Sequence, residues 1–269
     1  MNVDWTKAAP AWDLLRQEVE GMKVELTDRL FAGIGPLEGR RILELGAGTG
    51  ELAARLADAA GPAGSVVASD VAPGMVELLR ARLGGRATVE VAQIDAAEIA
   101  LPDDSVDVVV FRMGLMLMTE PVVALAEFRR VLRPGGRLAV AVWAGPQDNP
   151  WMTSVGMAAM MHGLVQGGPP VGPGGPFSLS DPVDLEKRMS NAGFAEVEVE
   201  PVASSRLYPD ADEHVRVVLA LSPHLADAAA QATPEQLAML KVTVAGLTEQ
   251  YRTSDGLRIP SRALLGLAT

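Results

Sequence analysis

The feature that most constrains this chain is a run of glycines between a strand and a helix, followed one strand later by an acid. Residues 42–50 read ILELGAGTG, and Asp70 ends the strand-like segment SVVASD. Gly46, Gly48 and Gly50 permit positive φ angles and let a ligand approach bare backbone. The helix predicted after them begins with free N–H groups, which favour polar or anionic ligand groups. Simple turn chemistry would use the same glycines.

Asp70 narrows the ligand class. An acidic residue about 20 positions after such a loop typically hydrogen-bonds ribose hydroxyls, so the two features together predict a nucleoside site. An N-cap role in the following helix is the alternative for Asp70. A dinucleotide-binding loop carries G-x-G-x-x-G, but here Glu51 stands where its third glycine belongs. This disfavours a nicotinamide oxidoreductase.

The segment ELGAGTG resembles motif I of the class I S-adenosylmethionine-dependent methyltransferases. Three further blocks resemble that family in order and spacing: SDVAPGMVELLRARL, QIDAAEIALPDDSVDVVVFR and EFRRVLRPGGRLAVAVW. Together the blocks cover residues 40–143. The likeness is greatest to the small-molecule branch that includes the ubiquinone- and menaquinone-biosynthesis methyltransferases. One departure is Ile94, which stands where many relatives have glycine.

The resemblance implies that S-adenosylmethionine is bound and that S-adenosylhomocysteine is its product. The implied cofactor residues are Gly46, Ala47, Gly48 and Gly50 along the methionine and ribose, Glu44 near the amino group, Asp70 on the ribose diol, Val71 and Met75 at the adenine, Asp95 on the adenine amino group, Ala96 through its backbone, and Arg112 after the fourth strand. Two of these have structural alternatives, since Asp95 could be a loop cap and Arg112 a structural ion-pair partner.

The architecture follows from the residues as well. Apolar strand signals begin at Arg41, Ser65, Thr88, Val106 and Arg137, and they alternate with helical stretches. Such alternation implies an α/β fold with helices on both faces of a parallel sheet. With the resemblance, the expected fold is the Rossmann-like class I methyltransferase fold, with seven strands, mostly parallel, and an antiparallel last strand. Ligands bind beyond the carboxyl ends of such strands.

The chain is expected to form one domain over residues 1–269. Within it we expect an N-terminal helical cap segment at 1–35 and a cofactor-binding core at 36–143. The segments 144–176 and 210–256 are expected to be largely helical insertions, and the resemblance implies that they form a substrate cap.

The second half of the chain has weaker signals. Residues 180–192 predict a helix with Ser180 as its N-cap, and 195–202 alternate like a strand with one solvated face. Residues 261–268 predict the last strand. The run QGGPPVGPGGP, 166–176, excludes a helix or strand interior, so it is either a surface connector or the hinge of a lid.

Methionine and tryptophan predict where an apolar substrate would bind. Methionine suits adaptable apolar pockets, and ordinary core packing is the alternative for both residue types. The candidate wall residues are Met113, Met116, Met118, Met152, Met157, Met160, Met161, Trp5, Trp12, Trp143 and Trp151.

Composition excludes several classes of function. The formal net charge of -11 argues against a nucleic-acid partner, because neutralising phosphates requires a basic surface. Cysteine is absent, which removes disulfides, thiolate metal sites and a thiol nucleophile, and no metal is expected. No apolar run reaches about 18 residues, and the first residues do not resemble a signal peptide. We therefore expect no membrane insertion and a cytoplasmic location, as a monomer or a homodimer.

The expected function is transfer of a methyl group from S-adenosylmethionine to an O, N or C atom of a small, apolar, cyclic metabolite. The enzyme would chiefly hold the nucleophile in line with the methyl group, at roughly 3 Å. An acidic hydroxyl acceptor also benefits from a base, for which His162 is preferred over His214 and His224; each histidine could instead be structural. Arg112 is the second catalytic candidate. The alternative function is an S-adenosylmethionine-binding protein that does not methylate, such as a cyclase- or decarboxylase-like enzyme or a ligand sensor.

Overall fold

The chain alternates strands and helices through its first half and places most later helices outside the sheet. The structure, a computed structural model, describes residues 4–269. Its elements are α1 (Trp5–Leu14), α2 (Arg16–Gly21), α3 (Val24–Ile34), β1 (Arg41–Leu45), α4 (Glu51–Ala60), β2 (Ser65–Asp70), α5 (Pro73–Leu83), β3 (Val89–Gln93), β4 (Val106–Arg112), η1 (Leu115–Leu117), α6 (Pro121–Val131), β5 (Leu132–Trp143), η2 (Pro146–Asp148), α7 (Pro150–Met161), α8 (Pro182–Asn191), β6 (Glu198–Tyr208), α9 (Ala211–Leu221), α10 (Pro223–Ala230), α11 (Pro234–Thr248), η3 (Glu249–Tyr251), β7 (Arg252–Thr253) and β8 (Gly256–Ala268).

The sheet has the strand order β3-β2-β1-β4-β5-β8-β6. Strands β1 to β5 are mutually parallel, whereas β8 runs antiparallel to both β5 and β6. The predicted α/β class and the seven-stranded sheet with its antiparallel last strand are confirmed. The two-residue strand β7, which pairs with β8, is an addition that the sequence did not predict.

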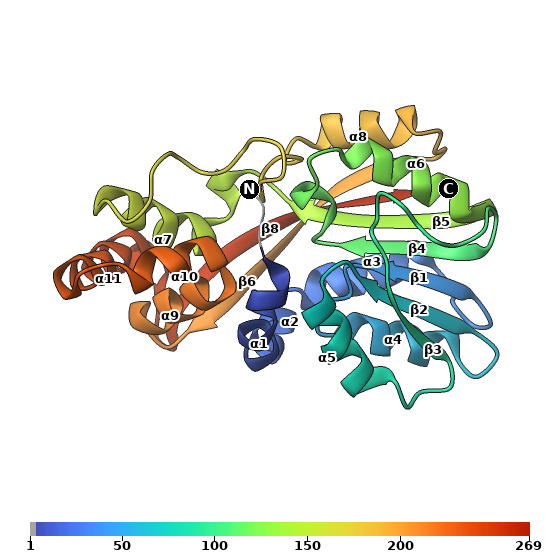
Figure 1. The fold of residues 1–269 in the computed structure, drawn as a ribbon. Coiled ribbons are helices and arrows are strands. Elements are labelled where there is room, and N and C mark those ends of the chain that lie inside the picture. Colours follow the sequence, from blue (N-terminus) through green and yellow to red (C-terminus); the bar gives the residue numbers. More distant parts are fainter. Residues whose placement is uncertain (1–3) are drawn as a thin grey trace.

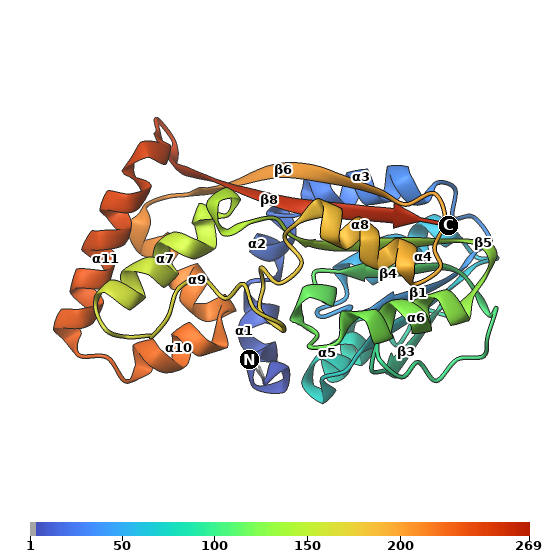
Figure 2. The same ribbon diagram turned by 90° about the horizontal axis from the view of Figure 1, so that it is seen from above.

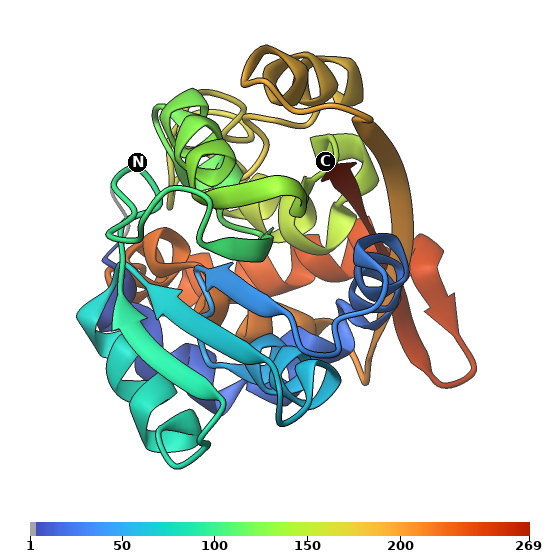
Figure 3. The same ribbon diagram turned by 90° about the vertical axis from the view of Figure 1, so that its right-hand side faces the viewer.

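Two helical layers enclose the sheet. Helices α3, α4 and α5 cover one face, and α6 and α8 cover the other (Figure 1). Figure 3 shows the same layers along the strands, with the sheet twisting between them. The central strand β4 is buried on both faces, and Val108, Val109 and Val110 are all inaccessible or nearly so. A continuous apolar run is what such a strand requires.

Several predicted boundaries in the second half are corrected. Helix α8 is capped by Asp181 rather than Ser180, because the Asp181 carboxylate accepts a hydrogen bond from Val183 N at 2.9 Å. Strand β5 begins at Leu132, before the Pro-Gly-Gly turn. That turn forms an irregularity in the ladder, since Leu132 pairs with Val106 and Arg137 already pairs with Val108.

Strands β6 and β8 are longer than predicted because they pair with each other beyond the core. Their ladder runs from Glu198 opposite Leu267 to Tyr208 opposite Leu257. Figure 2 shows both strands extending from the core to a separate group of helices. This group, α7 with α9 to α11, packs together outside the sheet. Helix α1 contacts both α5 of the core and α9 of this group.

The helices are short. Helix α11 is one of the longer ones, with 15 residues. No helix between residues 4 and 269 combines the length and the apolar character that crossing a membrane requires.

Candidate cofactor and substrate site

The turn between β1 and α4 forms the base of the candidate cofactor site. Gly46, Gly48 and Gly50 all have positive φ, of 57°, 56° and 91°. A Cβ atom on Gly48 would have no heavy atom of the described part of the chain within 4 Å, so the backbone faces open space there. A Cβ atom on Gly50 would lie 3.0 Å from Leu79 Cδ2, because this glycine packs against α5. The turn therefore both exposes backbone to a ligand and packs tightly against its neighbour.

The Asp70 carboxylate lies at the end of β2 beside this turn. Its Oδ2 accepts a hydrogen bond from Gly48 N at 3.1 Å, and its Oδ1 accepts one from Ala72 N at 3.0 Å. The backbone of Ala47 also donates to Ser69 O at 2.8 Å. Burial raises the pKa of Asp70, and the backbone donors oppose that shift. These bonds fix the Asp70 carboxylate in position. It therefore both contacts the backbone at the start of α5 and lies beside the glycine turn.

Glu44 lies near the carboxyl end of β1, at the same edge of the sheet as Asp70, and is 2% exposed. Its Oε2 atom is buried and has no hydrogen-bond partner among residues 4–269. Burial raises the pKa of Glu44 to about 8, although the Arg112 guanidinium and Lys23 amine oppose the shift. Buried polar atoms nearly always have a partner, so this oxygen is suited to a positively charged ligand group. An amino group such as that of S-adenosylmethionine fits this requirement.

The residues expected near the adenine have different surroundings. Val71 is 51% exposed at the tip of β2, and Asp95 is exposed after β3. Asp95 Oδ1 accepts a hydrogen bond from Ala97 N at 2.9 Å, which is a loop-cap contact. Ala96 is buried beside it. Met75 is covered by α1, where it packs in a cluster with Ala9.

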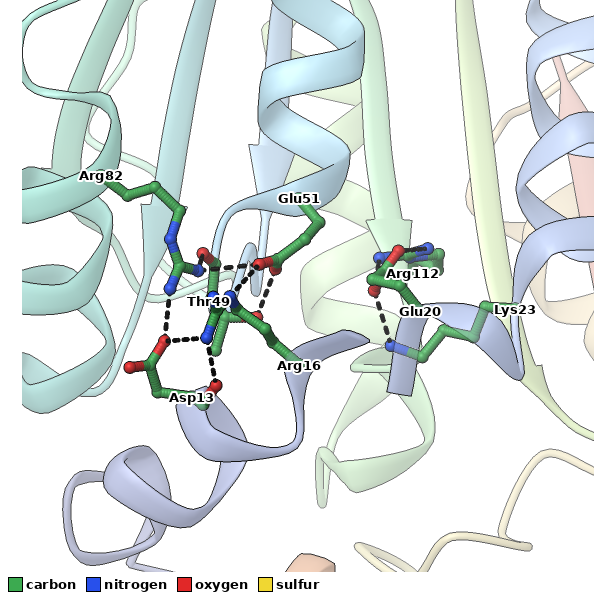
Figure 4. A network of polar contacts seen from close by, with 8 residues as sticks. All are labelled: Asp13, Arg16, Glu20, Lys23, Thr49, Glu51, Arg82 and Arg112. Carbon is green, nitrogen blue, oxygen red and sulfur yellow. Dashed lines mark hydrogen bonds and ion pairs between the residues drawn. The ribbon is translucent and has the colours of Figure 1, made fainter. Parts of the chain in front are cut away.

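Arg112 forms one half of the polar network in Figure 4. Its Nη1 and Nη2 atoms donate to the two carboxylate oxygens of Glu20 at 2.9 and 2.6 Å. Nη1 also donates to Thr27 Oγ1 at 2.8 Å. These contacts are those of the structural ion-pair alternative, and the catalytic and cofactor roles of Arg112 stay predictions. Its guanidinium holds α2 and α3 against the end of β4, which is the ion-pair alternative.

A second set of contacts in Figure 4, centred on Arg82 and Glu51, links the N-terminal helices to the glycine turn. Arg82 on α5 contacts Asp13, the carbonyl of Thr49 and, at 2.8 Å, Glu51 Oε1. Arg16 approaches the same Glu51 oxygen at 3.8 Å. Each of these partly exposed pairs contributes little to stability alone. Together they hold the end of α1 and the start of α2 over the start of α4.

A largely apolar cavity of about 310 Å³ lies between the core, the N-terminal helices and the outer helices. The charged side chain that lines it is that of Lys23. The predicted wall is largely confirmed, although Met118 and Met161 are not among the lining residues. From the predicted set, the cavity is lined by Trp5, Trp12, Trp143, Trp151, Met113, Met116, Met152, Met157 and Met160, and the Gly/Pro run adds residues 166–170 and 176.

His162 is not brought to this cavity. Its Nε2 lies 2.7 Å from Thr243 Oγ1, and its carbonyl accepts from Gln236 Nε2 at 3.0 Å. These contacts join the end of α7 to α11, and the role of His162 as a base stays a prediction that this placement does not support. His224 lines the cavity instead. His214 is fully buried, and its Nε2 lies 2.6 Å from the carbonyl oxygen of Trp151, which lines the cavity.

Two charged residues of the site, Glu20 and Lys23, were not predicted from the sequence. The only local signal is their i,i+3 spacing with opposite charges, which is equally typical of a solvated helix surface. Their importance comes from Arg112 and from the cavity wall, which lie far along the chain.

Comparison with known proteins agrees with the fold. Residues 43–140 match the family model described as a methyltransferase domain. Demethylmenaquinone methyltransferase of Clavibacter sepedonicus is 43% identical over 113 residues, which are 42% of this chain and 45% of that protein. The ubiquinone/menaquinone biosynthesis C-methyltransferase of Ectopseudomonas mendocina is 35% identical over 153 residues, 55% of this chain and 59% of that protein. The chain therefore spans about half the length of the curated relatives it matches.

Solved structures extend the fold likeness to the whole chain. The cyclase SpnF superposes with a TM-score of 0.56 at 20% identity, and the match covers 99% of this chain and 97% of SpnF. At that identity the likeness describes the fold alone.

Proposed function

We propose that this chain, whose residues 43–140 match a methyltransferase domain and whose fold is similar to solved methyltransferase structures, transfers a methyl group from S-adenosylmethionine to a small apolar ring. The observation that carries the proposal is the buried, unpartnered Oε2 of Glu44 beside the fixed carboxylate of Asp70. Glu44 would receive the amino group, and Asp70 the ribose diol. Val71, Asp95 and Ala96 would surround the adenine.

The bound sulfonium supplies an already activated methyl group. The protein's part is to align the acceptor with that methyl and to exclude water. The N-terminal helices serve this purpose, because the Arg112–Glu20 and Arg82–Asp13 contacts fasten them over the strand ends. The apolar walls of the cavity would then orient a ring beside the donor.

The names of the relatives favour a quinol as the acceptor and carbon as the acceptor atom. Those proteins are described as acting on demethylmenaquinone and as a C-methyltransferase of quinone biosynthesis. The aromatic and thioether walls here suit a fused or substituted ring. We therefore place the acceptor in the class of apolar quinols.

To test this proposal, the purified protein is incubated with S-adenosylmethionine and naphthohydroquinone under reducing conditions. We expect release of S-adenosylhomocysteine and a ring-methylated product, identified by mass spectrometry with fragmentation. The matched control is a naphthohydroquinone whose two free quinol-ring carbons already carry methyl groups, which should give no C-methylated product.

The alternative makes a different prediction. A protein that binds S-adenosylmethionine without methylating would bind S-adenosylhomocysteine in calorimetry, yet release none from the donor with any quinol, phenol or amine acceptor. That pair of results would overturn methyl transfer and leave a cyclase-like or sensor function.

A further inference from the structure

Lys23 lies where the apolar cavity meets the charged groups at the strand ends. It lines the cavity, and its side chain is only 11% exposed. Its Nζ atom lies 3.4 Å from Glu20 Oε1 and 6.0 Å from the centre of the Trp12 ring, which lines the same cavity. A nitrogen of this kind, on an apolar wall, is positioned to meet a polar atom of a bound ring.

Glu20 does not fully neutralise Lys23. The Glu20 carboxylate already accepts two short hydrogen bonds from Arg112, and the bond from Lys23 is longer than both. The charged groups around Lys23 are Glu20 on α2, Arg112 on β4, Glu51 on α4 and Glu44 on β1. One like charge and three carboxyl groups therefore lie near it, and two of those carboxyls are bound to arginines, Glu20 to Arg112 and Glu51 to Arg82.

We propose that Lys23 is a catalytic residue, whose neutral amine takes the proton of an acceptor hydroxyl and whose ammonium then holds the oxyanion. This inference rests on the proposed function, because it concerns the acceptor of that methyl transfer. His224 also lines the cavity, from α10. Lys23, however, is the lining residue that also contacts Glu20 at the strand ends, where the donor would bind.

The surroundings of Lys23 favour the proton exchange. Burial, followed by the nearby Arg112 guanidinium, lowers the pKa of the Lys23 amine to about 8, while Glu20 and Glu51 oppose the shift. A base is most effective when its pKa lies near the working pH. Lys23 is thus able to accept a proton that an exposed lysine would leave in place.

The step balances in protons and electrons. The acceptor O–H bond breaks, its electron pair stays on oxygen, and the proton moves to the Nζ lone pair. The oxyanion, through its own oxygen or the adjacent ring carbon, forms the new bond to the donated methyl, and the electrons of the old bond remain on sulfur. After attack through carbon, the ring C–H proton leaves to water and Nζ returns its proton to oxygen. One proton is released overall.

A binding experiment tests Lys23 without any methyl transfer. Nitrophenol, whose anion is coloured, is titrated with protein saturated with S-adenosylhomocysteine. We expect the wild-type protein to bind the phenolate and to lower the apparent pKa of the probe. Lys23→Met should weaken phenolate binding about tenfold or more, whereas Lys23→Arg should retain it because the positive charge remains.

The matched control is Lys241→Met. This lysine on α11 pairs with Asp212 at 3.1 Å, is 48% exposed and does not line the cavity, so the variant should bind the probe like wild type. Calorimetry with S-adenosylhomocysteine verifies that each variant is folded. Equal phenolate binding by wild type and Lys23→Met would overturn the proposal.

A kinetic experiment separates proton transfer from charge. With naphthohydroquinone, the wild-type kcat should rise with pH through about 8. Lys23→Arg, which is always protonated, should lose about a hundredfold in kcat and should lack that rise. An unchanged pH profile in Lys23→Arg would overturn the role as base. If no acceptor is methylated, the proposed function fails, and the phenolate titration still decides whether Lys23 binds an oxyanion.

Discussion

The Arg112 guanidinium and the Glu20 carboxylate form a two-point ion pair, with nitrogen–oxygen distances of 2.6 and 2.9 Å. The planar fork of arginine matches both carboxylate oxygens at once. The pair joins the end of a central strand to a helix that also carries a wall residue of the cavity, Val19. This one contact therefore links the end of β4 to the helix that covers part of the cavity.

Breaking this contact should cost stability. Arg112→Met would leave the largely buried Glu20 carboxylate with only the longer bond from Lys23, and we expect a loss of about 3 kcal/mol in the free energy of unfolding. Urea denaturation measures this, and hydrogen exchange should show faster exchange of the amides of α2. The control is Arg55→Met, which breaks an exposed pair with Asp28 and should cost less than about 1 kcal/mol. Equal losses in the two variants would contradict the expectation.

Glu44→Gln should have opposite effects on stability and on ligand binding. The Glu44 pKa is about 8 in the folded protein and 4.5 ordinarily, so the folded state holds an extra proton between these values. Wild-type stability therefore falls as pH rises from about 4.5 to about 8. Glutamine does not titrate, so the free energy of unfolding of Glu44→Gln should exceed that of wild type by on the order of 3 kcal/mol at pH 7.

The same substitution should weaken S-adenosylhomocysteine binding about tenfold or more, because a charge-assisted hydrogen bond is lost. Denaturation at several pH values and calorimetry measure the two effects. Glu77→Gln, an exposed change on α5, serves as the control for both. Unaltered binding by Glu44→Gln would separate Glu44 from the ligand.

Asp70→Ala should weaken S-adenosylhomocysteine binding by about 1–3 kcal/mol, because the carboxylate would lose its bonds to the ribose diol. Calorimetry measures the change. Asp103→Ala removes an exposed acid that pairs with Arg130 and should leave the affinity as it was. Wild-type affinity in Asp70→Ala would remove Asp70 from the cofactor site.

His214 should make the protein sensitive to mild acid. Burial lowers its pKa to about 4 from 6.5, although the bond to the Trp151 carbonyl opposes the shift. The unfolded state then binds a proton near pH 6.5 that the folded state refuses until about pH 4. The free energy of unfolding should therefore fall as the pH drops from about 6.5 to about 4, by up to about 3 kcal/mol. His214→Gln should flatten the fall between pH 7 and 5 in urea denaturation, and parallel curves for the two proteins would contradict this.

The parts of this structure that could be predicted from sequence depend on local patterns. The glycine turn, the position of Asp70 and the buried run in β4 each follow from a few adjacent residues. The apolar cavity was also predictable, because methionine and tryptophan are concentrated in segments that must leave the sheet. Met161 shows the limit of such reasoning, since its place on the helix turns it to solvent, where it is 61% exposed.

The parts that could not be predicted depend on distant contacts. Glu20 and Arg112 are 92 residues apart, and nothing near either one indicates its partner. The contact between His162 Nε2 and Thr243 Oγ1 likewise joins residues 81 positions apart, and nothing near His162 in the sequence indicates it. The length of β6 and β8 was missed for the same reason, because each strand extends only where the other pairs with it.

The pairing of Tyr208 with Leu257 has a consequence for how such a chain can diversify. The segment between these two residues starts and ends at one point of the β6–β8 ladder, and its helices supply Val218, Leu221 and Leu225 to the cavity wall. A replacement segment of another length could join the same two positions without shifting the register of the sheet. We therefore expect that the segment between Tyr208 and Leu257, and with it one wall of the cavity, can be replaced while the glycine turn keeps its geometry.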